Sequence, residues 1–243
     1  MVESIMIYLC ILTDSRILWG INMVSKLLEV RKTALWDKYV GRFEEVGGSI
    51  FPRWFSSLEG AVLDVGCGYG KFLASLRKAR LKVGLEISAV ALKRGKELYH
   101  LENLACGSAT DLPFKKSTFN YVTLIEVIEH LHDPQKLLEE ARRVLKPSGY
   151  LLIKTPNYPF KRFYDLKQSI VKNRTFRMPP DDLTHYSPFS WRKLNKILKS
   201  HFQDVRLLPF GIVFENRLPS SIRTVYLKMF FLLSHKIIAI AKK

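Results

Sequence analysis

From about residue 61, short apolar segments alternate with longer amphipathic ones. The short segments predict buried strands, because brief apolar runs bounded by turn residues are typical of a sheet core. They are AVLDV (61–65), LKVGLEI (81–87), LACGS (104–108), FNYVTLIEV (119–127) and GYLLIKTP (149–156). The amphipathic segments predict helices over 71–79, 88–99 and 133–145. Strands separated by helices indicate an α/β fold with a parallel sheet and helices on both faces.

Capping residues support two of these helices. Ser88 is suited to cap the helix over 88–99, and Asp133 with Pro134 is typical of a helix start. The tetrapeptide KPSG (146–149) predicts a turn before the fifth strand. Because ligands of such sheets bind at the carboxyl ends of the strands, we look for chemistry there.

The alternation ends after residue 156, where prolines, cations and aromatic residues accumulate. The segment 160–177 predicts an amphipathic helix whose apolar stripe holds Phe163, Leu166 and Ile170. By itself this stripe favours a helix packed on the core with a solvated basic face. Further on, the pattern predicts a helix over 187–200 and strands over 205–210 and 236–241.

The two ends of the chain contain apolar stretches that do not have the features of membrane or signal segments. Residues 1–22 carry Glu3 where a signal peptide has positive charge, and no small-residue cleavage site follows. We interpret them as a flexible extension or a misplaced start, with residues 23–243 forming one domain. The run over 226–243 is interrupted by charged residues, which favours a helix followed by a strand over a membrane span.

Composition narrows the choice of partners. The chain has 39 Lys and Arg against 22 Asp and Glu, a formal net charge of +17. Such a charge favours RNA, an anionic membrane surface or acidic small substrates, although a solvated basic surface is an equal alternative. Three scattered cysteines do not suggest a disulfide framework or a zinc site, and they favour a cytoplasmic protein.

Three glycines follow the first predicted strand in VLDVGCGYG (62–70). Gly66, Gly68 and Gly70 fit neither the dinucleotide fingerprint G-x-G-x-x-G nor a P-loop, whose glycine and lysine spacing differs. Asp64, at the end of the strand, is a poor neighbour for a pyrophosphate and suits a cationic ligand. Glu86 ends the second strand, where a carboxylate can accept hydrogen bonds from both ribose hydroxyls.

These motifs resemble those of class I S-adenosylmethionine (SAM)-dependent methyltransferases, in particular the ubiquinone-biosynthesis type and its small-molecule relatives (methyltransferase type 11). The resemblance rests, in order, on VLDVGCGYG, VGLEIS, GSATDLPF, FNYVTLIEVIEHLHDP and RRVLKPSGYLLIKTPN, and continues weakly through HYSPFSWRKLNKIL. It implies a Rossmann-like fold with a mainly parallel seven-stranded sheet. It also implies that the segment 156–190 is a substrate cap.

The resemblance assigns cofactor roles by position. Asp64, Gly66 and Gly68 would border the methionine end of SAM, and Gly70 would shape the turn. Among the other family positions, Glu86 would bind the ribose, and Ile87, Ser108 and Ala109 would border the adenine. Glu126 would lie close to the cofactor, and the aromatic residues Trp36 and Tyr39 would cover it. Many relatives have Asp at the position of Ser108, whose hydroxyl can still accept a hydrogen bond.

The segment IEVIEHLHD holds the candidates for catalysis. Glu126, Glu129 and His130 are spaced i, i+3 and i+4, so on a helical turn they would share a face. With His185 they make a candidate Mg²⁺ or Mn²⁺ site, which resembles the metal site of ubiquinone-pathway O-methyltransferases and of small-RNA 2′-O-methyltransferases. The alternative is a metal-free site in which Glu129, His130 and His185 act as bases or support the loop.

The sequence leaves three functions open. The first is a SAM-dependent methyltransferase that acts on a small molecule at oxygen. The second is a methyltransferase that acts on RNA, by metal-assisted 2′-O transfer, or on a lipid while peripheral to a membrane, for which the basic and aromatic segment 160–177 argues. The third is a non-catalytic module that only binds SAM.

Overall fold

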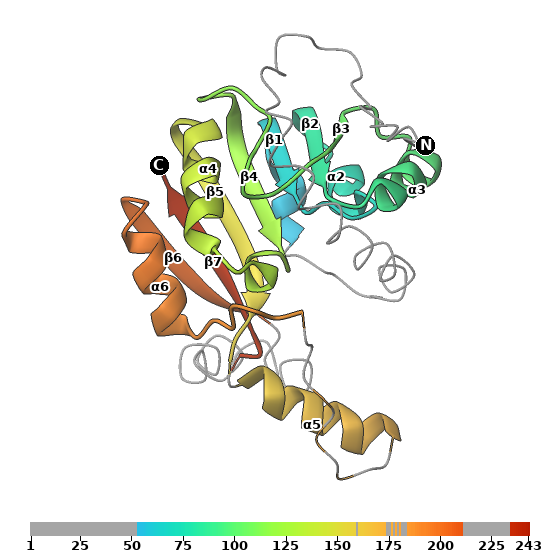
Figure 1. The fold of residues 1–243 in the computed structure, drawn as a ribbon, viewed down its shortest axis with the longest axis vertical. Coiled ribbons are helices and arrows are strands. Elements are labelled where there is room, and N and C mark those ends of the chain that lie inside the picture. The colour runs from blue at the N-terminus through green and yellow to red at the C-terminus, as the bar shows by residue number, and fades with distance from the viewer. Residues whose placement is uncertain are drawn as a thin grey trace, which may run out of the picture. The chain divides into compact units, whose positions relative to one another are not determined.

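The computed structural model describes residues 53–158, 160–173, 176, 178, 180, 184–210 and 234–243 (Figure 1). They form a seven-stranded sheet in the order β3-β2-β1-β4-β5-β7-β6. The strands are β1 (Gly60–Val65), β2 (Ala79–Glu86), β3 (Leu104–Cys106), β4 (Phe119–Ile125), β5 (Leu145–Pro156), β6 (Asp204–Phe210) and β7 (Lys236–Lys242). The predicted seven-stranded α/β fold is confirmed.

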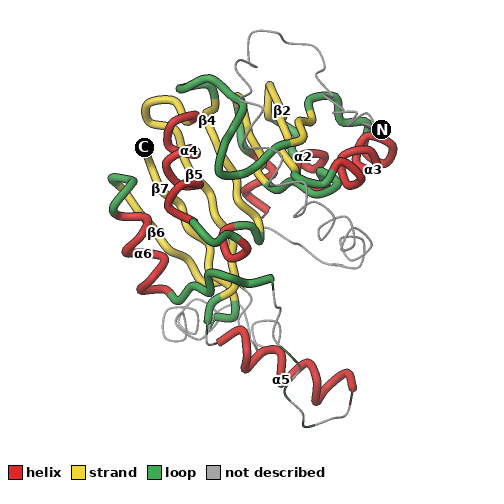
Figure 2. Tube along the Cα trace, viewed as in Figure 1, coloured by secondary structure: helices red, strands yellow, loops and turns green. Residues whose placement is uncertain are grey.

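The described helices are drawn in red in Figure 2. They are the 3-10 helix η3 (Arg53–Ser57), α2 (Lys71–Ser75), α3 (Ala89–Tyr99), the 3-10 helix η4 (Ile128–His130), α4 (Pro134–Val144), α5 (Phe160–Asn173) and α6 (Trp191–Lys199). Among the described residues, no helix is long and apolar enough to cross a membrane.

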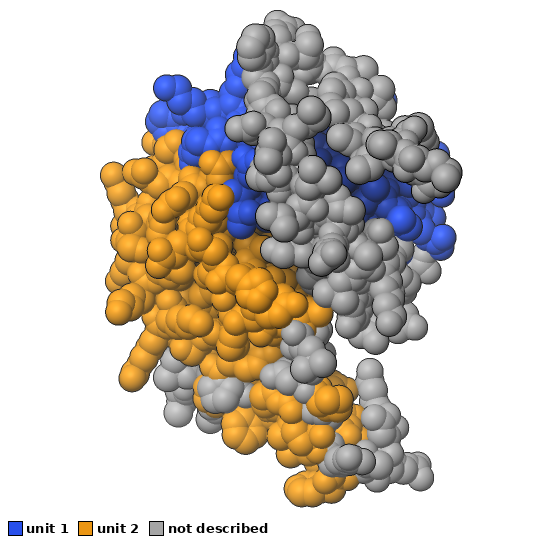
Figure 3. Space-filling view, viewed as in Figure 1, with its two compact units in different colours: residues 1–123, 143–147 blue, residues 124–142, 148–243 orange. Residues whose placement is uncertain are grey.

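The chain divides into two compact units, coloured separately in Figure 3. The first comprises residues 1–123 and 143–147, and the second comprises residues 124–142 and 148–243. The predicted single domain over 23–243 and the substrate cap over 156–190 stay predictions. Residues 1–22, Trp36, Tyr39 and the helix expected before residue 234 lie outside the described residues.

In the first unit, the parallel strands β1, β2 and β3 form the buried sheet that the apolar runs predict. The register pairs Asp64 with Gly84, and Gly84 must lack a side chain because a Cβ there would lie 2.7 Å from the Cys67 sulfur. Helix α3 begins at its predicted cap, since the Ser88 hydroxyl accepts a hydrogen bond from Ala91 N. Helix α2 is shorter than predicted, because the Leu76 backbone is extended and β2 already begins at Ala79.

In the second unit, β7 lies antiparallel to both β5 and β6. Helix α6 begins after its cap Ser190 and buries one apolar face through Trp191, Leu194 and Leu198. The predicted helix over 160–177 is present as α5, but Phe163 and Ile170 of its stripe are exposed. The stripe is therefore not packed on a core as its periodicity favours. The predicted KPSG turn is instead part of β5, with Ser148 at a φ of +60°.

Candidate active site

The glycine turn after β1 is held by backbone geometry. Gly66, Gly68 and Gly70 have φ values of +71°, +54° and +78°, a region that side-chain-bearing residues rarely adopt. The N–H groups of Gly66 and Cys67 both donate to Leu85 O, at 2.7 and 3.0 Å, which fixes the turn against the end of β2. The turn thus exposes backbone rather than side chains to a ligand at the strand ends.

Glu86 connects this turn to the beginning of α3. One carboxylate oxygen accepts from Gly68 N at 3.0 Å, and the other accepts from the N–H groups of Ile87 and Ser88 at 2.8 and 3.1 Å. The side chain is buried, and these three hydrogen bonds fix the orientation of its carboxylate. Glu86 is therefore fixed at the strand end where the sequence predicts a ribose-binding carboxylate.

Asp64 is a buried carboxyl at the end of β1. Burial raises its pKa to about 7, the charge of Glu86 acts in the same direction, and the Thr123 hydroxyl, which donates to Asp64 Oδ1 at 2.6 Å, opposes the increase. Among the described residues, none forms an ion pair with Asp64. A cation bound beside Asp64 and Glu86 would supply the missing positive charge.

The turn after β3 lies next to Glu86, because Gly107 N donates to Glu86 O at 3.0 Å. The Ser108 hydroxyl lies 2.9 Å from Thr110 Oγ1 and accepts from Thr110 N at 3.2 Å, so it shapes the turn that also contains Ala109. Cys67 is buried, and burial raises the pKa of its thiol well above the usual value. A buried thiol with a raised pKa suits a small packing residue and not a nucleophile.

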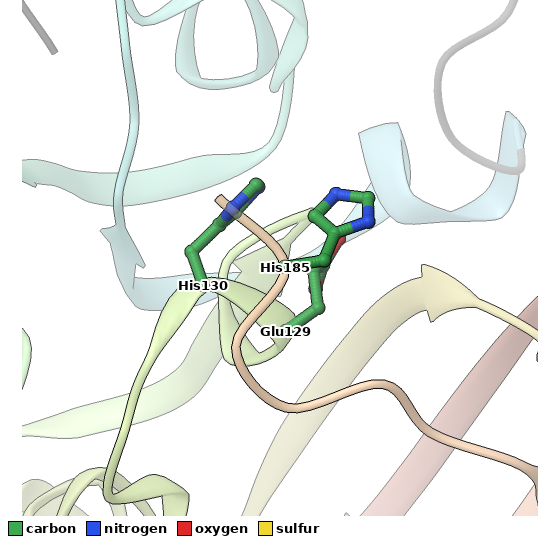
Figure 4. A group of neighbouring side chains, drawn as sticks. All are labelled: Glu129, His130 and His185. Atoms are coloured by element: carbon green, nitrogen blue, oxygen red, sulfur yellow. The ribbon is translucent and has the colours of Figure 1, made fainter. Parts of the chain in front are cut away.

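Glu129, His130 and His185 converge in the second unit, as Figure 4 shows. One oxygen or nitrogen atom from each lies within 4.8 Å of the others. Thr155 Oγ1 donates to Glu129 Oε2 at 2.8 Å, whereas the buried Oε1 has no hydrogen-bond partner among the described residues. Ser187 N donates to Glu129 O at 2.9 Å, which ties the segment carrying His185 to η4.

The two imidazoles are oriented by hydrogen bonds. His130 Nδ1 lies 3.1 Å from Thr184 O and 3.0 Å from Thr184 Oγ1, and in the tautomer in which Nδ1 donates to the carbonyl the neutral ring has its lone pair on Nε2. His185 Nδ1 lies 2.6 Å from the Tyr158 hydroxyl. Burial and the charge of Glu126 raise the pKa of Glu129 to about 8. The cluster therefore offers polar groups suited to accepting a proton or binding a cation.

Glu126 does not join this cluster, which differs from the face-sharing that its spacing predicts. The helical turn begins only at Ile128, and Glu126 itself has a φ of +57°. Its Oε1 lies 3.1 Å from Lys154 Nζ and 2.7 Å from Lys236 Nζ. Burial alone would raise the pKa of Glu126, but the two lysines lower it to about 2.

Sequence reasoning missed several residues that surround these carboxyl groups, namely Thr123, Lys154, Thr155, Tyr158, Thr184 and Lys236. One signal was present in the sequence. Lys154 interrupts the apolar run GYLLIKTP, and a charged residue inside a buried strand needs a partner.

The glycine turn, the acidic residues at the ends of β1 and β2, and the sheet whose last strand is antiparallel define the class I methyltransferase fold. Residues 63–153 match the model of the methyltransferase domain family, in agreement with the motifs.

Individual relatives agree with this assignment. The chain is 34% identical over 98 residues to a probable S-adenosylmethionine-dependent methyltransferase of Mycolicibacterium smegmatis, covering 40% of this chain and 38% of that protein. It is 29% identical over 135 residues to a ubiquinone biosynthesis O-methyltransferase of Coxiella burnetii, covering 53% and 56%. The chain thus spans about half the length of the curated relatives it matches.

A solved structure shares the fold. The crystal structure of a SAM-dependent methyltransferase from Thermotoga maritima superposes with a TM-score of 0.58, covering 89% of this chain and 99% of that one, at 18% sequence identity. At this identity the similarity concerns the fold alone.

Proposed function

We propose that the chain transfers a methyl group from SAM to an oxygen atom of a small acceptor molecule. The observation that carries the SAM part is Asp64, a buried carboxyl at a glycine turn that forms no ion pair among the described residues, with the buried carboxylate of Glu86 at the end of the next strand. The Coxiella burnetii relative named as an O-methyltransferase supports oxygen as the acceptor atom. A bound SAM supplies a methyl group on a positively charged sulfur.

The described residues fit this cofactor. Asp64 and the glycine turn would border its methionine end, and Glu86 would lie at its ribose. Ile87, Ser108 and Ala109 would border the adenine. Because a methyl cation equivalent is transferred in line, the chain's main task is to align the acceptor and exclude water.

An acceptor hydroxyl must also lose its proton. We assign this proton to Nε2 of His130, in the tautomer in which Nδ1 donates to Thr184 O. Glu129, whose Oε1 is buried without a partner, would hydrogen-bond the acceptor, and His185 would orient it. A divalent cation bound by Glu129, His130 and His185 is the second candidate for lowering the acceptor pKa, since nitrogen and oxygen ligands together suit Mn²⁺.

The test is an assay with radiolabelled SAM and sets of phenols, aliphatic alcohols and amines, with and without a chelator. Labelled phenol or alcohol supports the proposal, and label only in amines contradicts the oxygen acceptor. Loss of activity on chelation, restored by Mn²⁺, favours the cation over His130 alone. Saturable SAM binding without product from any acceptor class would favour the non-catalytic module.

A specific surface favours a second partner, an anionic membrane. On and after α5 the side chains of Phe163, Val171 and Phe176 are 62%, 66% and 85% exposed. Apolar residues beside cations are typical of helices that lie in the headgroup region, and the chain carries a net charge of +17. We infer that α5 binds an anionic lipid surface on which a lipid acceptor is reached.

Co-sedimentation with vesicles of anionic and of neutral lipid tests this inference. We expect binding to anionic vesicles only, weakened about tenfold by Phe163→Ser. Equal binding by the variant contradicts it. Tight, salt-dependent binding of RNA in the absence of vesicle binding would support the RNA alternative instead. A cytoplasmic location stays a prediction.

A further inference from the structure

Lys154 and Lys236 lie on adjacent strands and point to the same face of the sheet. In the antiparallel register Lys154 pairs with Ile238, and Lys236 pairs with Pro156. The two lysines are therefore diagonal neighbours two positions apart, a relation that places side chains on one face. Both Nζ atoms reach Glu126 Oε1, at 3.1 and 2.7 Å.

Glu126 is held in this position by an unusual backbone. Its φ of +57° lies in the left-handed region that favours glycine, and its N–H donates to Lys154 O at 2.8 Å. Residues without glycine's freedom keep such a conformation only where the surroundings enforce it, and such residues cluster at functional sites. The carboxylate between the two lysines is thus placed at a cost to the backbone.

The charges of this group do not balance. Two ammonium groups share one carboxylate, and the Lys154 and Lys236 side chains are only 3% and 27% exposed. Among the described residues, the only carboxylate within ion-pair distance of Lys154 and Lys236 is that of Glu126. The Phe210 ring, 5.4 Å from Lys154 Nζ, offers weak compensation. Burial lowers the pKa of Lys154 to about 8 and the charge of Lys236 acts in the same direction, against the opposing charge of Glu126, whereas the Glu126 and Glu129 carboxyl groups raise the pKa of Lys236.

The group lies beside the catalytic cluster, because the charges of Glu126 and Lys236 both act on Glu129. We propose that Lys154 and Lys236 bind an anionic oxygen group of the acceptor, a carboxylate or a phosphate. This inference rests on the proposed methyl transfer, and it defines the acceptor as a hydroxy compound that carries a negative charge. The bound anion would supply the second counter-charge that the lysine pair lacks.

Calorimetric titration of the full chain with three probes tests the proposal. The probes are salicylate, which carries a hydroxyl and a carboxylate, its uncharged amide, and inorganic phosphate. We expect salicylate or phosphate to bind at least about tenfold more tightly than the amide, the loss expected when a buried charge partner is removed. Tighter binding of salicylate identifies a carboxylate acceptor, and tighter binding of phosphate identifies a phosphorylated one. Binding of neither, or equal binding of the amide, overturns the proposal.

Two substitutions with opposite expected effects test whether the anionic probe binds at Lys154 and Lys236. Lys236→Met should weaken the anionic probe about tenfold, whereas Glu126→Gln should tighten it severalfold, because it removes the competing carboxylate. General structural damage does not tighten binding. Lys242→Met, on the same strand β7, is the matched control and should leave probe binding unchanged. Unchanged binding in both Lys236→Met and Glu126→Gln overturns the proposal.

SAM titrations of the same proteins separate this proposal from the proposed function. Retained SAM binding by Lys236→Met shows that the cofactor half is intact while anion binding is lost. Absence of SAM binding in the parent chain contradicts the methyltransferase function, and the probe titrations still decide whether the lysine pair binds anions.

Discussion

The glycine turn of the first unit and the lysine pair of the second bring together side chains of opposite charge. Asp64 and Glu86 are two buried carboxyl groups, and Asp64 forms no ion pair among the described residues. Lys154 and Lys236 bring two cations around a single carboxylate. Because burying an unbalanced charge is costly, each imbalance indicates the charge of the ligand that relieves it. The first site is complementary to a cation, and the second to an anion.

The largest effect is expected from the backbone of the cofactor site. Gly68→Arg should abolish SAM binding, with a loss of at least about 100-fold, because the φ of +54° is strained for a side chain and the Gly68 N–H is fixed on Glu86. Calorimetry measures the loss, and circular dichroism checks that the variant is folded. A folded variant with parent-like SAM affinity would disprove the assignment of the turn.

A somewhat smaller effect is expected when the acceptor site loses its base. His130→Gln should lower kcat about 100-fold and leave SAM affinity unchanged, since the imidazole acts only in proton removal. The exposed His132, two residues along, provides the control, and His132→Gln should retain parent activity. Equal kcat for His130→Gln and the parent would remove His130 from the mechanism.

The pH dependence of SAM binding tests whether the cofactor site is complementary to a cation. Burial raises the pKa of Asp64 to about 7, so below that pH the free protein holds a neutral carboxyl that must lose its proton to attract a cation. SAM affinity should therefore decrease as the pH falls below about 7, by up to about tenfold per pH unit. Asp64→Asn should bind SAM weakly with no such pH dependence.

Thr123→Val sharpens the same test. Because the Thr123 hydroxyl donates to Asp64 and lowers its pKa, the variant should move the midpoint of the pH dependence upward. A pH dependence that persists in Asp64→Asn would assign the titration to another group.

The smallest expected effect concerns support of Glu129. Thr155→Val removes the donor at 2.8 Å from Glu129 Oε2 and should lower the free energy of unfolding by about 1 kcal/mol. Thr118→Val, whose exposed hydroxyl donates to Lys115 O, is the control and should change stability less. A loss of stability no larger than that of the control would show that the buried hydrogen bond contributes nothing.

The sequence predicted the parts of the molecule that depend on local pattern. The apolar runs identify the strands, because a strand that is buried on both faces consists mainly of apolar residues. Ser88 and Asp133 cap their helices as predicted. The helix predicted over 71–79 failed at its end, because Ala79 already pairs with Gly60 in the sheet. Long-range pairing overrides helical periodicity there.

The candidate site was predicted only in part. Glu129, His130 and His185 do come together, but the pairing of Glu126 was missed because the spacing argument assumes a helix through a residue whose φ is +57°. Lys236 could not be paired with Lys154 from sequence, since their proximity depends on the register of two strands far apart in the chain.

The origin of Lys236 on β7 has a consequence for how such a protein can diversify. The cofactor carboxyls come from β1 and β2, whereas half of the lysine pair comes from the strand that is last in chain order. If the lysine pair binds the acceptor as proposed, exchanging the segment that carries β7 would alter acceptor choice without replacing a strand that carries the cofactor carboxyls. Acceptor preference could then be changed by replacing this one segment.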